Sequence, residues 1–192
     1  ARERHPEYAL YKTWLLPSDD PWPQRYVTYD NVLVWRALSD LARLQAQRGH
    51  AQVAERLNKH ARDVSIAILQ HCVVEGPLGP MFAWSVDLAG AHRLYDEPPG
   101  SLLLLPHYGF CSNQDATWRR TRDWVHSRDY EYSFVGKPFS EVGCAHAKHP
   151  WVLAAVNSLL AGERERAVDF LCRARLDNGL ACESVDENTG EA

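Results

Sequence analysis

The sequence predicts an all-α fold of helix hairpins, with a small β-hairpin inserted between them. Two observations carry this prediction. Amphipathic segments occur in two consecutive pairs, and a glycine separates the two members of each pair. Polar, aromatic connections rich in Gly and Pro follow the pairs, as is typical of loops held by a rigid scaffold.

The first predicted hairpin covers residues 29–48 and 50–74, which Gly49 separates. Apolar side chains recur at helical spacing along both segments, so each helix has one apolar stripe. In the first segment these are Leu33, Ala37, Leu41 and Leu44, and in the second Val53, Leu57, Ala61, Val64, Ile68 and Cys72.

The second predicted hairpin covers residues 150–161 and 163–176. Pro150 suits the first turn of a helix, and Gly162 suits the break between the two helices. The chain thus repeats one kind of unit, although it contains no strict sequence repeat.

Shorter elements fill the region between the hairpins. Residues 81–95 have strand-like composition around a central Ala-Gly pair and predict the β-hairpin. Residues 100–109 predict a short buried helix, and residues 113–126 an exposed one.

Length and charge limit the class of protein. With 192 residues and 45% hydrophobic content, the chain can bury a substantial core, and it is expected to form a single domain, residues 1–192, or a large piece of one. The net charge is −4, and no basic block could neutralise a run of phosphates. We therefore expect no nucleic-acid partner.

The sequence predicts a soluble protein. No uninterrupted apolar run approaches the roughly 20 residues that a membrane helix requires, and the first ten residues lack the apolar centre of a signal peptide. The five cysteines are odd in number and widely spaced, which suits reduced thiols and a cytoplasmic location. Because the chain starts without Met, we expect an N-terminal portion to precede it.

Acidic residues gather in the predicted loops in four sets. These are Asp19 with Asp20, Asp96 with Glu97, Glu183, and Asp186 with Glu187. Hydrolysis of a glycosidic bond needs a carboxylic acid and a second carboxylate, which usually come from distant segments. Two simpler interpretations stay open. Ser18 or Asp19 could cap a turn or helix, and the DENTG segment could be an ordinary exposed turn.

Aromatic side chains lie in or beside the same loops, among them Trp84 and Tyr108. Aromatic rings stack on the C–H faces of sugars, although each residue taken alone is more often part of a core. Their grouping with carboxylates favours a carbohydrate site.

Four segments in order resemble glycoside hydrolase family 125, the metal-independent exo-α-mannosidases. They are LPSDD, YDEPPGSLLLLPHYGF, VGCAHA and GLACES. The family shows a Pro-Ser-Asp-Asp loop, an acidic pair before a Pro-Ser-Leu-Leu helix, a Gly-Ser-Pro-His-Thr loop and a Gly-Leu-x-His-Glu-Ser-Phe segment. The resemblance spans residues 16–184.

The resemblance implies an α/α toroid of the six-hairpin glycosidase type and inverting, exo-acting hydrolysis of α-mannosides, with an α-1,6 linkage as the finer expectation. It implies that Asp19 or Asp20 is the general acid and Glu183 the general base. It places Asp96, Glu97 and His146 at sugar-contacting positions. We expect no cofactor and no metal, and a carbohydrate substrate as the partner.

The chain also departs from the family pattern. Leu16 stands where the family commonly has Arg, Glu97 replaces an Asp, Cys182 replaces the His before the Glu, and Val185 replaces a Phe. A His-to-Cys change removes a hydrogen-bonding partner beside the base. Roughly half of the toroid is expected here, so exposed apolar helix faces should favour self-association, and this piece alone should be a poor catalyst.

Two alternatives remain. One is a carbohydrate-binding relative that keeps the aromatic loops without turnover. The other is a metal site in the CAHAKH segment, where Cys144, His146 and His149 lie close in sequence, although zinc normally recruits a more regular ligand set.

Overall fold

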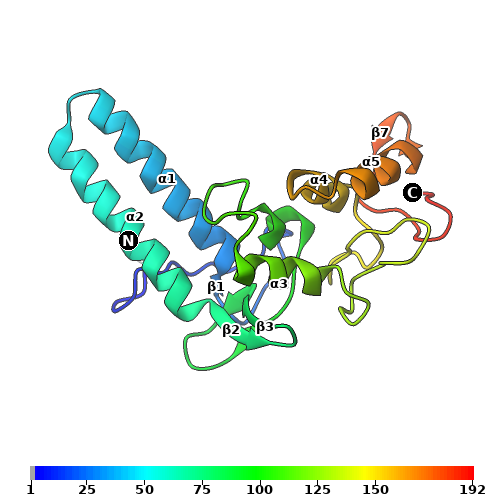
Figure 1. Cartoon of the computed structure of the whole chain (residues 1–192), viewed down its shortest axis with the longest axis horizontal. Helices are drawn as coiled ribbons and strands as arrows, with labels where there is room; N and C mark the ends of the chain where they lie inside the picture. Colours follow the sequence, from blue (N-terminus) through cyan, green and yellow to red (C-terminus); the bar gives the residue numbers. More distant parts are fainter. Residues whose placement is uncertain (1–2) are drawn as a thin grey trace.

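The computed structural model describes residues 3–192 and has two helical arms on a central body of short strands and turns (Figure 1). One arm is the hairpin of α1 and α2, and the other is the hairpin of α4 and α5. The arms diverge from the body, so the molecule has a concave edge between them.

The first predicted hairpin is confirmed. Helix α1 spans Thr28–Gln47 and α2 spans Ala51–His71. Gly49 lies in the turn between them with φ of 80°, a left-handed conformation that glycine adopts without steric cost. The helices bury small and branched side chains, which are Val32, Ala42, Ala54, Ala61, Val64, Ala67 and Ile68.

The central body contains more strand than the sequence predicts. Strands β2 (Val73–Gly76) and β3 (Gly79–Phe82) form an antiparallel hairpin directly after α2. Strand β4 (Ser85–Val86) pairs with β1 (Tyr26–Val27) on one side and with β5 (His92–Arg93) on the other. The expected β-hairpin in residues 81–95 is therefore present as β4–β5, within a mainly helical fold.

The segment predicted as a short buried helix forms two short 3₁₀ turns, η1 (Pro98–Gly100) and η2 (Leu102–Leu104). Helix α3 (Ala116–Val125) begins at Asp115, whose carboxylate accepts hydrogen bonds from two backbone N–H groups of the first turn. The prediction that this helix is exposed is wrong for one face, since Trp118 and Val125 are buried against the body.

The second predicted hairpin is also confirmed. Helix α4 spans Val152–Leu160 and α5 spans Arg164–Arg173, with Gly162 at φ of 99° in the turn between them. A small hairpin of β6 (Leu176–Asp177) and β7 (Leu180–Ala181) follows α5. The chain then returns to α4, because Trp151 forms an isolated β-bridge with Ser184.

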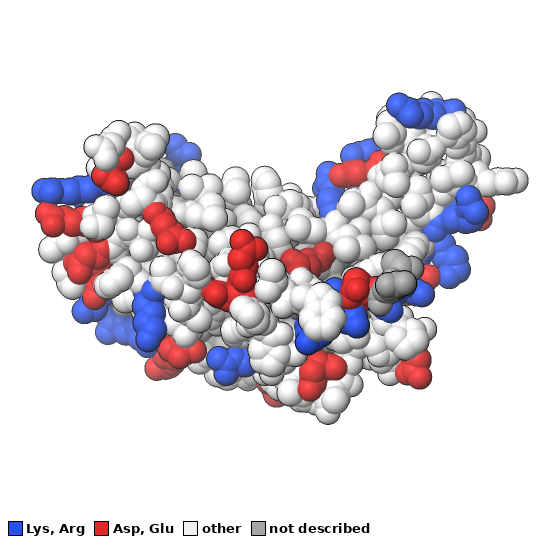
Figure 2. Space-filling model, turned by 180° about the vertical axis from the view of Figure 1, so that it is seen from behind, with Lys and Arg blue, Asp and Glu red and all other residues white. Residues whose placement is uncertain are grey.

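Both arms leave apolar side chains in solvent. The exposed ones on the helices are Leu33, Leu41 and Leu44 of α1, Ile66 and Leu69 of α2, Leu153, Val156 and Leu160 of α4, and Val168 of α5. Figure 2 shows that the concave edge between the arms is mainly uncharged, whereas acidic and basic side chains alternate over the rest of that face. Exposed apolar faces are thus present as expected, while self-association stays a prediction.

In residues 3–192, no helix combines the length and the apolar character that a membrane span needs. The five cysteines carry free thiols.

Candidate active site

Three loops bring together Asp20, His146 and Glu183, which come from distant parts of the chain. Nδ1 of His146 lies 2.9 Å from Oδ2 of Asp20, and Nε2 of the same ring lies 3.8 Å from Oε1 of Glu183. The imidazole therefore stands between the two carboxylates. All three side chains are partly exposed to solvent.

A tight turn presents the two adjacent aspartates differently. The backbone N–H of Asp19 donates to the carbonyl of Leu16. Asp19 has a left-handed φ of 66°, and the residue is exposed to solvent. Asp20 accepts a hydrogen bond from the Ser18 hydroxyl at 3.3 Å in addition to its contact with His146. Asp20, and not Asp19, therefore joins the cluster.

The capping interpretation of these aspartates is wrong for the helix that follows. Helix α1 begins at Thr28, its N-cap is Val27, and no side chain caps it.

Glu97 holds in place the turn of residues 16–20 that carries Asp19 and Asp20, called the aspartate turn below. Its side chain is completely buried, and its Oε1 accepts the Ser18 backbone N–H at 3.0 Å. Burial raises the pKa of Glu97, the hydrogen bonds from Ser18 oppose that rise, and the nearby charge of Asp20 adds to it. The expected sugar contact of Glu97 is wrong for this structure, because the carboxylate holds the turn and does not reach the surface.

The surroundings of His146 favour a positive charge on its ring. The hydrogen bond with Asp20 raises the pKa of His146 above its ordinary value. Desolvation opposes this rise, and the charges of Asp20, Glu183 and Glu97 add to it. The ring also lies edge-on to Trp151, with centroids 6.2 Å apart.

Trp151 ties the loop of His146 to the segment of Glu183. Its indole N–H donates to the carbonyl of Ala147 at 2.8 Å, and its backbone N–H donates to the carbonyl of Val142. The next residue, Val152, donates its N–H to the carbonyl of Glu183 at 3.1 Å. No pattern in the sequence singles out Trp151, since hydrogen bonds between loops leave no periodic signal.

Asp96 has a structural role, so its predicted sugar contact is wrong. The carboxylate is buried and accepts the Ser101 hydroxyl at 2.6 Å and the Leu102 backbone N–H at 2.7 Å, which holds the start of η2. Burial raises the pKa of Asp96 to about 7, although both hydrogen bonds oppose the rise.

The two aromatic candidates lie away from the cluster. Trp84 is fully buried in the core, edge-on to both Trp22 and Tyr95, so its predicted stacking on a sugar is wrong. Tyr108 is half-buried, and its hydroxyl pairs with that of Tyr29 on α1 at 3.1 Å. Within residues 3–192, no hydrogen bond joins Tyr108 to the three clustered residues.

The DENTG segment forms the ordinary turn that the simpler interpretation predicted. Oδ1 of Asp186 accepts the backbone N–H groups of Asn188 and Thr189, and these contacts lower the pKa of Asp186. Glu187 pairs with His149 at 2.9 Å.

These contacts argue against the metal site suggested by the CAHAKH segment. Cys144 is buried and His146 pairs with Asp20, so Cys144, His146 and His149 do not form the proposed ligand set. In the described residues, the group with ligand-like geometry is His149 with Asp186 and Glu187, where the aspartate already serves the turn.

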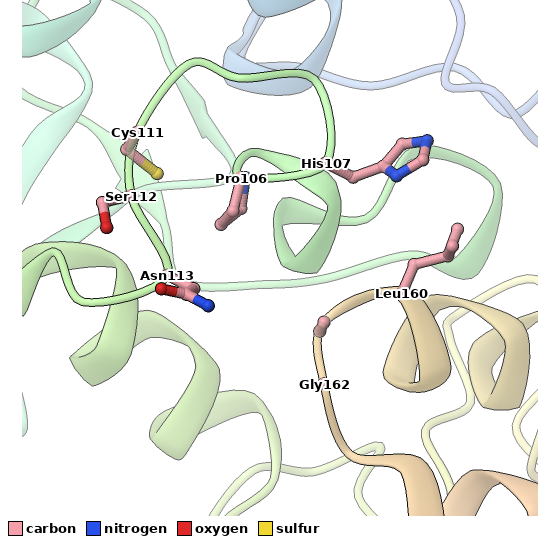
Figure 3. Close-up of a pocket in the computed structure, with 8 residues that line it drawn as sticks. Pro106, His107, Cys111, Ser112, Asn113, Leu160 and Gly162 are labelled. Carbon is pink, nitrogen blue, oxygen red and sulfur yellow. The ribbon is translucent and has the colours of Figure 1, made fainter.

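One cavity lies beside the cluster and a second lies at the end of α4. An apolar one of about 370 Å³ lies beside Glu183, and Trp151, Val156 and Cys182 contribute to its wall. Another, of about 320 Å³, lies between the loop after η2 and the end of α4 (Figure 3). In that cavity the ring of His107 points away from Cys111, so the two do not form a nucleophile and base pair.

Comparison with known proteins identifies relatives of the chain. Residues 3–192 match the model of the family described as metal-independent alpha-mannosidase (GH125). The meiotically up-regulated gene 157 protein of Schizosaccharomyces pombe is 28% identical over 187 residues, which cover 93% of this chain and 37% of the relative.

A solved structure has the same fold. It is a metal-independent alpha mannosidase of Streptococcus pneumoniae in a non-productive complex with alpha-1,6-mannobiose. The TM-score is 0.82 at 22% identity, and the match covers 97% of this chain but 46% of that one. The chain thus spans less than half the length of both relatives.

Proposed function

The chain belongs to the metal-independent alpha-mannosidase family GH125, and from this premise we propose that it forms part of an inverting, exo-acting α-mannosidase. The observation that carries the proposal is the meeting of Asp20 and Glu183 on either side of His146. An α-1,6-linked mannoside is the substrate class we propose, because the solved relative binds such a disaccharide.

We assign the general acid to Asp20 and the general base to Glu183. Inverting glycosidases place these groups roughly 6.5–9.5 Å apart, which leaves room for a water on the face opposite the leaving group. An imidazole ring with contacts of 2.9 Å and 3.8 Å to its two neighbours supports a separation of this class. The exposed side chain of Asp19 supports the choice of Asp20.

In the proposed reaction, Asp20 protonates the glycosidic oxygen as its bond to the anomeric carbon breaks. Glu183 takes a proton from the water that attacks this carbon from the other side. Glu97 acts through the turn: its hydrogen bond to the Ser18 N–H holds the backbone that positions Asp20.

We propose that residues 1–192 form one domain that continues into a larger α/α toroid. The exposed apolar faces of α1 and α4 and the shorter length relative to both matched proteins support this proposal. Water enters an open site and weakens the electrostatic stabilisation of a charged transition state. The 192-residue chain alone is therefore expected to be slow.

A hydrolysis assay on a longer polypeptide that contains this chain tests the proposal. Glu183→Gln should remove nearly all turnover of α-1,6-mannobiose while sugar affinity stays close to that of the wild type, because the amide keeps the shape but accepts no proton. Asp20→Asn should lose several hundred-fold on mannobiose and much less on an aryl mannoside, whose leaving group needs no protonation.

Asp19→Asn is the matched control, since it makes the same change one residue away on an exposed side chain. Equal losses in the two variants would contradict the assignment of the acid. A wild-type protein that binds mannobiose and never cleaves it would instead favour the carbohydrate-binding alternative.

A further inference from the structure

The position of His146 suggests more than a contact to the sugar. The ring fills the space between the proposed acid and base, where a substrate and its attacking water would lie. A ring that hydrogen-bonds Asp20 through Nδ1 is arranged to exchange a proton with it, and its other nitrogen lies 3.8 Å from Glu183.

We infer that His146 stores the proton of the acid–base pair in the unliganded site and passes it to Asp20 when a sugar displaces the ring. This inference deepens the proposed function and rests on it. His146 acts here through Asp20 and is therefore a positioning residue.

The charges around His146 favour storage of a proton on the ring. Three carboxylates face it from different segments: Asp20 from the aspartate turn, Glu183 from the segment after β7, and Glu97 from beneath the turn. The nearest aromatic ring, that of Trp151, carries no charge. In the described residues no cationic side chain forms an ion pair with Asp20 or Glu183 apart from His146.

The hydrogen bonds at Asp20 also support storage of the proton on His146. Its Oδ2 faces both the Ser18 hydroxyl and Nδ1 of His146, so two donors meet at one carboxylate oxygen. The unliganded site then keeps the transferable proton on Nδ1 of the ring, which lies between the two carboxylates.

Over one turnover, the three side chains return to their starting protonation states. When the sugar enters, the Nδ1–H bond breaks and an O–H bond forms on Asp20, which leaves His146 neutral. During hydrolysis this proton and the electron pair of the broken C–O bond go to the leaving oxygen, and Glu183 takes one proton from the attacking water. As the product leaves and the ring returns, Glu183 releases that proton to solvent. Nδ1, the ring nitrogen left without a proton, takes one from solvent beside Asp20, so the ring is protonated again.

Titration of the 192-residue chain by NMR, with ¹³C-labelled histidine, tests the inference without any need for activity. The signal of His146 is assigned by its loss in His146→Gln. Its midpoint should lie above the ordinary value near 6.5 and should fall in Asp20→Asn. It should fall less in Glu183→Gln, whose contact is longer, and least in the matched control Asp19→Asn.

The other eight histidines report whether each variant keeps its fold. Unchanged signals from them make a shift at His146 specific. If the midpoint is the same in the wild type and Asp20→Asn, or if Asp19→Asn shifts it equally, the proton store is overturned.

Addition of α-1,6-mannobiose tests the displacement of the ring. Saturating sugar should move the His146 midpoint of the wild type down towards that of Asp20→Asn, because the contact with Asp20 is broken. Sugar that binds and leaves the midpoint in place overturns the displacement. If a longer polypeptide that contains this chain also fails to bind the sugar, the proposed function is contradicted. The midpoints of the variants test the proton store in either case.

Discussion

The buried carboxyl group of Glu141 should make stability depend on pH. Its side chain is fully buried, its Oε2 accepts the Ser158 hydroxyl of α4 at 2.9 Å, and the Arg166 guanidinium of α5 lies 3.6 Å from its Oε1. Burial raises the pKa of Glu141 to about 7, although the charge of Arg166 and the hydrogen bond from Ser158 oppose the rise. Glu141→Gln keeps the shape and removes the ionisation.

The size of the effect follows from linkage. A folded-state pKa of about 7, against an ordinary value of 4.5, means that the native state holds this proton more tightly than the unfolded chain. The resulting stabilisation is complete below about pH 4.5 and is lost as the pH rises through about 7. At about 1.4 kcal/mol per pH unit, the loss is on the order of 3 kcal/mol.

Urea unfolding followed by circular dichroism, from about pH 4.5 to about pH 8, measures this loss. The wild type should lose on the order of 3 kcal/mol more than Glu141→Gln over this range. Glu75→Gln is the control, because Glu75 is an exposed carboxylate on β2. If the wild type and Glu141→Gln lose stability in parallel, the burial argument is refuted.

Three further changes probe the loops and the arms. Gly143→Ala puts a methyl group 2.7 Å from the carbonyl oxygen of His149, so it should destabilise the protein by about 2 kcal/mol and lower its melting temperature. Asp96→Ala leaves the buried Ser101 hydroxyl without its acceptor and should cost about 2 kcal/mol in urea unfolding. Leu153→Asp places a charge on the exposed apolar face of α4 and should reduce self-association in sedimentation velocity, a prediction that a monomeric wild type would contradict.

The helical hairpins could be predicted because their signal is local. Apolar residues repeat along α1 and α2, and Gly49 separates the two helices, so the observed bounds lie within a few residues of those expected. The sequence of β2 and β3 resembles a loop, since Gly76, Gly79 and Pro80 are turn-forming residues. The register of the hairpin places them at its tip, where Gly76 pairs with Gly79.

The site could be predicted only in part. The approach of Asp20 to Glu183 was expected from the order of motifs that resemble the family, and the structure brings the two side chains to one ring. The burial of Asp96, Glu97 and Trp84 was not expected, because a side chain in a loop carries no periodicity that tells inside from outside.

The hydrogen bond between Asp20 and His146 joins residues 126 positions apart, whereas the two helices of the first arm are adjacent in sequence. Contacts that close long loops cost more chain entropy, so they form late in folding and open early. The helices of α1 and α2 should then assemble before the carboxylates meet. In hydrogen exchange, the Val152 amide, which the Glu183 carbonyl holds, should exchange before the amides inside α2, so the site can come apart while its scaffold stays folded.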